Sequence, residues 1–393
     1  MADVSVIVPS YNHAAFVAEA IEGVLRQTAP VREVVVVDDG STDGSLERLR
    51  ALRDERIRLV VHECNRGGAE ALNTGIRETA GDLIAICNSD DVWEPDKIER
   101  QLRALDRDGE AAAVFSDVTW IDGDGAPGDP GRAFRSVFDQ PDRSRAGWLR
   151  RFVEEGNCLC HPSVLIRRGA YQRVGLYDNR YRQLPDYELW LRLVQHFEIA
   201  VMPDRLVRFR LHDNTSRPSP ATSSRTLNES ADILEALFLR LPCEDFFAAF
   251  GTLRSPHDPA FDLACEKVLY LFTAAGRQAD LLCWVGGRVG MSLLATAAGR
   301  DAWSRYGFSM SDFHTLRGTA NLWQLRGGEL TAAERDVLVR AGASSLPGEP
   351  RPADRPAEVA ALPAKRAGLP WRLKVRREVR RLGRQIGGLV GRS

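Results

Sequence analysis

The sequence has little of what marks several common protein classes. No segment approaches the roughly eighteen consecutive apolar residues of a membrane-spanning helix. The seven cysteines form no CxxC pair, and the spacing of Cys158 and Cys160 is only a weak metal signal. We therefore expect reduced thiols in a cytosolic protein. The start of the chain, Met1 to Asp3, leads directly into a strand pattern, which is not the pattern of a signal peptide.

Two nucleotide-binding signatures are also missing. No GxGxxG follows the first predicted strand, and no GxxxxGKS or GxxxxGKT occurs in the chain. These absences argue against a dinucleotide-binding Rossmann domain and a P-loop NTPase. With 393 residues, 44% apolar and 27% charged, the chain is expected to be a soluble globular protein of two or three units.

The net charge of −1 conceals an asymmetry between the body and the end of the chain. Ten Lys and Arg residues but only one acid, Glu378, lie between Lys365 and Ser393, so this segment carries +9 and the rest −10. Within it, apolar residues recur every three or four positions from Trp371 onward, with arginines between them. This pattern predicts a basic amphipathic helix over 371–393 that suits an anionic membrane surface. Nucleic acid would attract the same charge, and a solvated tail is the plain alternative.

The first third of the sequence alternates between strand and helix patterns. Short apolar, β-branched runs occupy 4–8, 33–37, 57–61, 83–87 and 111–115, and helical periodicity follows the first four. Such alternation predicts an α/β fold with a mostly parallel sheet sandwiched by helices. Four successive strand ends carry residues of the kind that hold a nucleotide: Ser10/Tyr11, Asp38/Asp39, Gly67/Gly68 and Asp90/Asp91. Because carboxyl ends of parallel strands share one edge, we expect a common crevice there.

The fourth of these strand ends is the most informative. The apolar run 83–87 leads into Asn88 and then into two adjacent carboxylates, Asp90 and Asp91. Neighbouring carboxylates repel each other unless a cation lies between them, which indicates a divalent metal carrying phosphate oxygens. A solvated acidic turn is the alternative reading of these residues alone.

Four segments in order, VSVIVPSYN (4–12), VVDDGSTDGS (36–45), NTG (73–75) and NSDD (88–91), resemble the family 2 glycosyltransferases of the GT-A fold. The resemblance extends over residues 3–215. It implies a nucleotide-sugar site that includes residues of all four segments and of the glycine pair: Pro9, Ser10, Tyr11, Asn12, Asp38, Asp39, Gly67, Asn73, Asn88 and Asp90. By this likeness Tyr11 faces the base, and Asp38 or Asp39 accepts from the base or ribose.

The same resemblance implies a Mg²⁺ or Mn²⁺ ion on Asp90 and Asp91. Asn88 stands where the family's D-x-D motif more usually begins, so it offers at most a neutral oxygen. His212 lies at the end of the region that resembles the family. The resemblance implies that it contacts the metal or the phosphates, and an ordinary structural histidine is the alternative. The Q-x-x-R-W motif of the processive members is missing, which favours transfer of one sugar at a time.

Asp186 resembles the catalytic base of the family. It follows Pro185, which replaces the family's usual glutamate, and it precedes the helical pattern of Leu189, Trp190 and Leu193. A helix-capping aspartate is the alternative reading, and the two roles are compatible. Glu188, two residues on, ranks well below Asp186.

Four segments are predicted: a catalytic domain at 1–218, a helical accessory domain at 219–343, a proline-rich linker at 344–370 and the basic helix at 371–393. The polar stretch 122–145 is either an acceptor-binding lid or a disordered insertion. In the accessory domain, which suits acceptor binding or homo-oligomerisation, we predict helices around Ile233–Leu241, from Asp258-Pro259 onward, and at 278–298. A strand is predicted at 161–166.

Together these features predict a metal-dependent, inverting glycosyltransferase of the hexosyltransferase type. The donor is a nucleoside-diphosphate sugar, with UDP favoured, and the acceptor a hydroxyl on a glycan or lipid-linked glycan. We expect a cytoplasmic protein with peripheral contact to the inner face of the cell membrane and no nucleic-acid partner. The rivals are a sugar nucleotidyltransferase, whose Gly-rich basic loop is missing after the first strand, and an inactive binding or scaffold protein marked by Asn88 and Pro185.

Overall fold

The computed structural model describes residues 3–131, 134–212 and 220–318. The chain divides into two compact units, Met1–Ser216 and Arg217–Ser393. The predicted linker 344–370 and basic helix 371–393 lie outside the described residues, as does the end of the predicted accessory domain.

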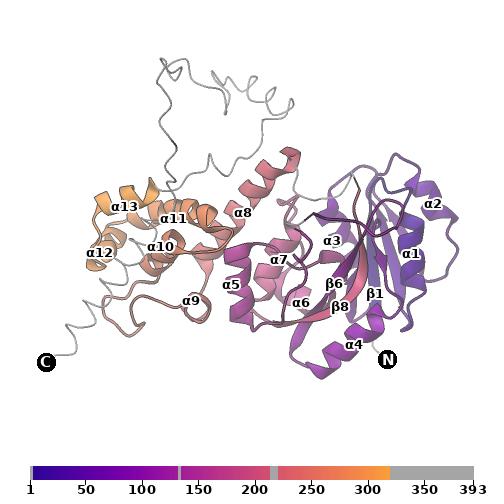
Figure 1. Ribbon diagram of the computed structural model, residues 1–393, viewed down its shortest axis with the longest axis horizontal. Helices are drawn as coiled ribbons and strands as arrows, with labels where there is room; N and C mark the ends of the chain where they lie inside the picture. The colour runs from indigo at the N-terminus through magenta and orange to yellow at the C-terminus, as the bar shows by residue number, and fades with distance from the viewer. Residues whose placement is uncertain (1–2, 132–133, 213–219, 319–393) are drawn as a thin grey trace, which may run out of the picture. The chain divides into compact units, whose positions relative to one another are not determined.

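The first unit is built on one eight-stranded sheet with helices on both faces (Figure 1). Its strands run in the order β3-β2-β1-β4-β7-β6-β8-β5. The strand bounds are β1 Val4–Ser10, β2 Glu33–Asp38, β3 Ile57–Val61, β4 Leu83–Ile86, β5 Val92–Trp93, β6 Ala111–Ile121, β7 Leu165–Arg167 and β8 Glu198–Arg210. The helices are α1 Val17–Leu25, α2 Ser45–Ala51, α3 Gly68–Glu78, α4 Lys97–Arg107, α5 Arg145–Glu155, η1 His161–Ser163, α6 Arg168–Val174 and α7 Pro185–Leu193.

The sheet is mixed but mostly parallel, which confirms the predicted α/β class. β1, β2, β3 and β4 are parallel neighbours, and β6 pairs with β8 in parallel. β7 lies antiparallel between β4 and β6, and β5 pairs antiparallel with β8 at the edge. The carboxyl ends of β1, β2 and β4 therefore meet at one edge of the sheet, where the predicted crevice lies.

Both faces of the central strands are buried, which explains their continuous apolar runs. Val4, Val6 and Val8 of β1 pack with the apolar residues of α1 on one face. On the other face, Val35 and Val37 of β2 pack against α3. Gly75 allows the close approach of α3 to β1, because a Cβ there would lie only 2.3 Å from Cγ2 of Ile7.

Two regions of this unit differ from the sequence predictions. The predicted strand at 161–166 is the short helix η1 followed by β7, because Pro162 cannot donate a ladder hydrogen bond. β8 and β5 were not predicted at all.

The polar stretch 122–145 is tethered by aromatic contacts, since Phe138 stacks on Trp120 with ring centroids 5.6 Å apart and also lies against Phe209.

The second unit is helical over its described residues, as predicted. Its helices are α8 Pro220–Arg240, α9 Cys243–Phe250, α10 Leu263–Thr273, α11 Ala279–Leu294, α12 Ala297–Arg305 and α13 Met310–Arg317. The helix predicted to open at Asp258-Pro259 begins instead at Leu263, where Asp262 accepts from the backbone N–H of Cys265 as the N-cap. The helix predicted at 278–298 breaks between α11 and α12, where Thr296 caps α12.

No single helix among the described residues has both the length and the apolar character to cross a membrane. The pair α11 and α12, bent by 117° at the break between them, meets that standard only when taken together.

One buried cation in the first unit has a clear energetic cost. Lys97 is fully buried, and its Nζ donates to Oε1 of Gln101 at 2.7 Å and lies 3.9 Å from the ring centre of Trp93. Burial lowers the pKa of Lys97 from 10.5 to about 7. The unfolded chain therefore holds this proton between about pH 7 and 10.5 while the folded chain does not, so stability rises with pH across that window.

We predict that Lys97→Met raises the free energy of unfolding at pH 6 by about 1–3 kcal/mol, because the buried charge is removed. The rise in stability between pH 7 and 10 should flatten as well. Urea denaturation at several pH values measures both effects. Arg107→Met, an exposed cation on the same helix, is the control that should leave the pH dependence unchanged; a destabilised Lys97→Met at pH 6 contradicts this account.

Candidate functional site

The loop after β1 links the ends of two neighbouring strands. Asn12 has a φ of 55°, a left-handed conformation that asparagine tolerates. Its backbone N–H donates to Oγ of Ser41 at 3.0 Å, and its Oδ1 accepts from the backbone N–H of Thr42 at 2.8 Å. The next residue, His13, contacts the loop after β4 through Ser89 Oγ at 2.8 Å. Three of the four predicted strand-end loops are thus joined by hydrogen bonds.

Ser10 and Asp38 form an unusual polar pair at the ends of β1 and β2. They are partners in the parallel ladder, and both are buried. Oδ1 of Asp38 accepts from the backbone N–H of Ser41 at 3.1 Å. Among the described residues, neither Oδ2 of Asp38 nor Oγ of Ser10 has a hydrogen-bond partner. Tyr11, the next residue in the chain, is 38% exposed, so its side chain reaches the surface.

Asp39 is engaged in a different way from Asp38. Its Oδ1 pairs with Nδ1 of His62 at 2.7 Å and accepts from the backbone N–H of Arg66. Its Oδ2 accepts from the backbone N–H of Gly67 at 2.9 Å. The carboxylate therefore fixes the loop before α3 and engages the Gly67 amide. Of the two aspartates proposed for the nucleotide, Asp38 is the one with an unsatisfied oxygen.

Asn73 is also occupied by the fold. Its Nδ2 donates to the backbone carbonyl of Tyr177 at 2.8 Å, and its Oδ1 accepts from the backbone N–H of the same residue at 3.0 Å. This two-point contact ties α3 to the segment before α7. The structure thus gives Asn73 an anchoring role, and its contact with the nucleotide sugar stays a prediction.

Asp90, His212 and His13 form a cluster with metal-binding chemistry. Each offers one ligand atom, and these atoms all lie within 4.8 Å of one another. Oδ2 of Asp90 lies 2.9 Å from Nε2 of His212 and 4.0 Å from Nε2 of His13. Burial lowers the pKa of His13, while the charge of Asp90 acts in the opposite direction. The sequence prediction included Asp90 and His212, and it missed His13 although this residue directly follows Asn12.

Asp91 does not join this cluster, which differs from the prediction. It is buried, and its Oδ1 accepts from the backbone N–H of Arg210 at 2.9 Å while its Oδ2 accepts from Nδ2 of Asn88 at 3.2 Å. Burial and the neighbouring charge of Asp90 raise the pKa of Asp91 well above its usual range. Asp91 lies outside the cluster because its side chain points into the sheet, toward Arg210 at the end of β8. Asn88 serves this same internal contact.

The predicted base, Asp186, lies in the first turn of α7. The helix begins at Pro185 with Leu184 as N-cap and no side-chain cap, so Asp186 is not the capping residue. Its Oδ2 accepts from Nδ2 of Asn157 at 2.7 Å, and its Oδ1 accepts from the backbone N–H of Tyr187 at 2.8 Å. Asn157 is in turn oriented by the backbone N–H of Leu159, which donates to its Oδ1 at 3.3 Å. No motif in the sequence points to Asn157.

The segment around η1 lies near both the predicted base, Asp186, and the loop that carries Asp91. Burial lowers the pKa of His161, and the charge of Asp186 opposes that shift. One residue earlier, burial raises the pKa of the Cys160 thiol well above its usual range, and the charge of Asp91 adds to the rise. Because such charge effects require proximity, the loops that bear Asp91 and Asp186 both lie near the start of η1.

Glu188, by contrast, is held in an ion pair. Both its carboxylate oxygens accept from Arg192, at 2.7 and 2.6 Å. Arg192 also donates to the backbone carbonyl of Leu176 at 2.8 Å. These contacts give Glu188 a structural role. Asp186 stays the predicted base, ahead of Glu188.

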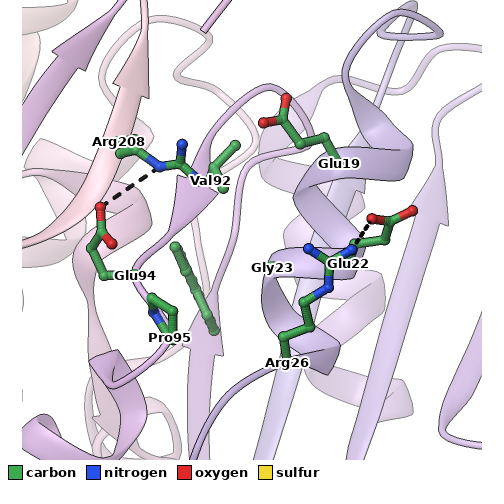
Figure 2. A pocket seen from close by; sticks show the side chains of 9 residues that line it. Glu19, Glu22, Gly23, Arg26, Val92, Glu94, Pro95 and Arg208 are labelled. Atoms are coloured by element: carbon green, nitrogen blue, oxygen red, sulfur yellow. Dashed lines mark hydrogen bonds and ion pairs between the residues drawn. The ribbon is translucent and has the colours of Figure 1, made fainter. Parts of the chain in front are cut away.

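A surface groove of about 350 Å³ lies elsewhere, between α1 and β5 (Figure 2). Its lining is mixed, with two ion pairs, Arg26–Glu22 and Arg208–Glu94, and with the apolar residues Val92, Trp93 and Pro95. None of the predicted site residues lines it. The groove is therefore distinct from the site predicted at the strand ends.

The different environments of Asp90 and Asp91 predict different mutant phenotypes. Asp91→Ala leaves the buried N–H of Arg210 without an acceptor and should lower the free energy of unfolding by about 2–3 kcal/mol. Asp90→Ala should change it by less than about 1 kcal/mol, because it removes a repulsion as well as the histidine contact. Urea denaturation compares the two variants, and equal losses would refute this division.

Comparison with known proteins agrees with the fold. The model of the family described as "Glycosyl transferase family 2" matches residues 5–175. The putative teichuronic acid biosynthesis glycosyltransferase TuaG of Bacillus subtilis is 32% identical over 215 residues, covering 54% of this chain and 80% of TuaG. An uncharacterized glycosyltransferase of Rickettsia prowazekii, RP339, is 29% identical over 272 residues, covering 66% of this chain and 78% of the relative.

A solved structure shares the fold at lower sequence identity. TarS of S. aureus, residues 1–349 in complex with UDP, superposes with a TM-score of 0.50 at 16% identity, over 81% of this chain and 90% of that chain. The structural match concerns the fold alone, whereas TuaG is similar to this chain in sequence over 80% of its own length. The chain belongs to glycosyl transferase family 2.

Proposed function

We propose that this glycosyltransferase transfers one sugar at a time from a nucleoside-diphosphate sugar to a hydroxyl acceptor, with inversion at the anomeric carbon and with a divalent metal. The observation that carries the proposal is that two carboxylates, Asp90 and Asp186, have different hydrogen-bond partners. Asp90 faces His212, and Asp186 lies at the start of α7 with hydrogen-bond donors on both oxygens. These different partners suit one carboxylate for a leaving diphosphate and the other for a proton.

The nucleotide is proposed to lie at the ends of β1 and β2. A buried carboxylate oxygen without a partner is rare in folded proteins, and Asp38 has one beside Ser10. A base N–H or a ribose hydroxyl is the type of donor that would satisfy it, and the exposed ring of Tyr11 offers a stacking surface. UDP is the favoured nucleotide, supported by the fold shared with TarS, which was solved with UDP.

The metal is proposed to be Mg²⁺ or Mn²⁺ on Asp90 and His212. The donor set fits, because a carboxylate oxygen and an imidazole nitrogen already lie 2.9 Å apart and both suit divalent ions. When bound, such an ion neutralises charge that develops on the leaving diphosphate. Asp91 and Asn88 contribute indirectly, by fixing the loop that carries Asp90.

The proton step is proposed for Asp186. The acceptor oxygen attacks the anomeric carbon from the side opposite the diphosphate, so the new C–O bond forms as the bond to the phosphate oxygen breaks. The acceptor proton passes to a carboxylate oxygen of Asp186, and the nucleoside diphosphate departs with the electron pair. Asn157 and the N–H of Tyr187 hold that carboxylate in place. An in-line displacement of this kind inverts the configuration.

The acceptor is proposed to be a cell-surface polysaccharide or a lipid-linked glycan. Support comes from TuaG, which is named for teichuronic acid biosynthesis, and from the basic pattern of residues 371–393. We propose a cytoplasmic protein in peripheral contact with an anionic membrane surface, where each basic residue contributes about 1 kcal/mol. A catalytically inactive scaffold is the alternative. It would be favoured if the native protein turned over none of the nucleoside-diphosphate sugars.

Asp186→Asn should lower turnover by about 10²–10⁴-fold, because the amide cannot accept the acceptor proton. Nucleotide and metal binding should be unchanged. The measurement is release of nucleoside diphosphate from UDP-, GDP- and dTDP-sugars with Mn²⁺, alongside calorimetric binding of UDP. Glu188→Gln is the matched control and should retain turnover; undiminished turnover in Asp186→Asn would remove this residue from the chemistry.

Asn157→Leu should lower kcat by about 10²-fold while KM for the donor stays unchanged, because the carboxylate of Asp186 loses the donor that orients it. Steady-state kinetics on the same sugar nucleotides separates the two parameters. A general folding defect would instead lower the active fraction and the melting temperature together. Unchanged kcat in a folded Asn157→Leu variant argues against the positioning role.

A further inference from the structure

His13 lies against the Asp90–His212 pair without having a role in the proposed mechanism. It comes from the loop after β1, whereas Asp90 comes from the loop after β4 and His212 follows β8. Nε2 of His13 and Nε2 of His212 both face the same carboxylate oxygen, Oδ2 of Asp90, at 4.0 and 2.9 Å. Three separate parts of the chain thus converge on one point.

The spacing of these atoms suits a single small cation. An ion with metal–ligand bonds of about 2.1 Å holds neighbouring octahedral ligands roughly 3 Å apart and opposite ones roughly 4.2 Å apart. The two distances to Asp90 lie within this range, and all three ligand atoms lie within 4.8 Å of one another. Small side-chain adjustments would bring the cluster into coordination.

The surroundings of His13 orient its ring toward that point. Its Nδ1 pairs with Oγ of Ser89 at 2.8 Å, and its backbone N–H donates to Oγ of Ser45 at 2.9 Å. Metal-binding histidines typically donate their other ring N–H to a neighbouring oxygen, which fixes the tautomer and leaves one nitrogen for the ion. Ser89 directly precedes Asp90 in the same loop. The hydroxyl that contacts the His13 ring and the carboxylate that the ring faces are therefore carried by neighbouring residues.

We infer that His13 is a third protein ligand of the metal, which completes a site of two imidazole nitrogens and one carboxylate oxygen. This inference rests on the proposed function, because it assigns a further ligand to the metal proposed there. Three protein ligands leave the remaining positions to diphosphate oxygens and water. Imidazole nitrogen favours transition ions, so the site selects Mn²⁺ or Co²⁺ over Mg²⁺.

A packing role for His13 makes a different prediction. Its ring contacts those of Phe16 and His212, with centroids 6.2 and 5.3 Å away. His13→Phe keeps an aromatic ring in this position and removes both nitrogens. If His13 acts only through packing, this variant behaves like the native protein toward metal, whereas His13→Ala loses stability.

Pulsed EPR of Mn²⁺ bound to the full chain, alone and with UDP, tests the inference by counting imidazole nitrogens. The native protein should give two, His13→Phe and His212→Ala one each, and His257→Ala two, since His257 is an exposed histidine of the second unit. His13→Phe should also weaken Mn²⁺ binding by at least about 10-fold and reduce the preference over Mg²⁺. Circular dichroism verifies folding of each variant.

The outcomes separate the two proposals. One nitrogen in the native protein, lost in His212→Ala and kept in His13→Phe, overturns the inference about His13 and leaves the proposed metal site intact. No bound Mn²⁺ with or without UDP overturns both. An unchanged nitrogen count in a folded His13→Phe likewise excludes His13 as a ligand.

Discussion

The guanidinium of Arg210 is buried at the end of β8 and joins four parts of the catalytic unit. It donates through Nε to the backbone carbonyl of Asp90 at 2.8 Å, through NH1 to the backbone carbonyl of Gly123 at 3.0 Å, and through NH2 to Glu19 at 2.6 Å. The backbone N–H of Arg210 donates to the carboxylate of Asp91. The loop after β4, the loop after β6, helix α1 and β8 are therefore fixed by one residue, two positions before His212.

This arrangement explains why adjacent aspartates have different roles. A buried guanidinium is tolerated only when its donors are satisfied and a negative charge lies nearby, and Glu19, paired with NH2 of Arg210 at 2.6 Å, supplies that charge. The backbone of Asp90 is held by the same guanidinium, so its side chain is directed to the other side, toward His13 and His212. The metal site proposed here thus depends on an ionic contact that does not itself touch the metal.

Much of the architecture could be predicted from the sequence, because parallel strands buried on both faces give continuous apolar runs. β8 escaped prediction, since its thirteen residues include Pro203, Asp204 and two arginines with exposed or half-buried side chains. The strand-end loops were predicted to meet, and β1, β2 and β4 do end at the same edge. Which motif residues face the crevice could not be predicted. Asp39 and Asn73 occupy motif positions yet make internal hydrogen bonds to residues 23 to 104 positions away. His13, Asn157 and Arg210 depend on equally distant contacts.

The central claim is that a centre formed by Asp90 and His212 serves a nucleotide held at the ends of β1 and β2, while Asp91 supports the fold. A crystal of the full chain grown with Mn²⁺ and UDP tests it through the anomalous signal of manganese. The account predicts a manganese peak bonded to Asp90 and His212, uridine against Asp38 and Tyr11, and Asp91 still accepting from the backbone N–H of Arg210. A peak on Asp91, or uridine bound away from Asp38, would contradict the account.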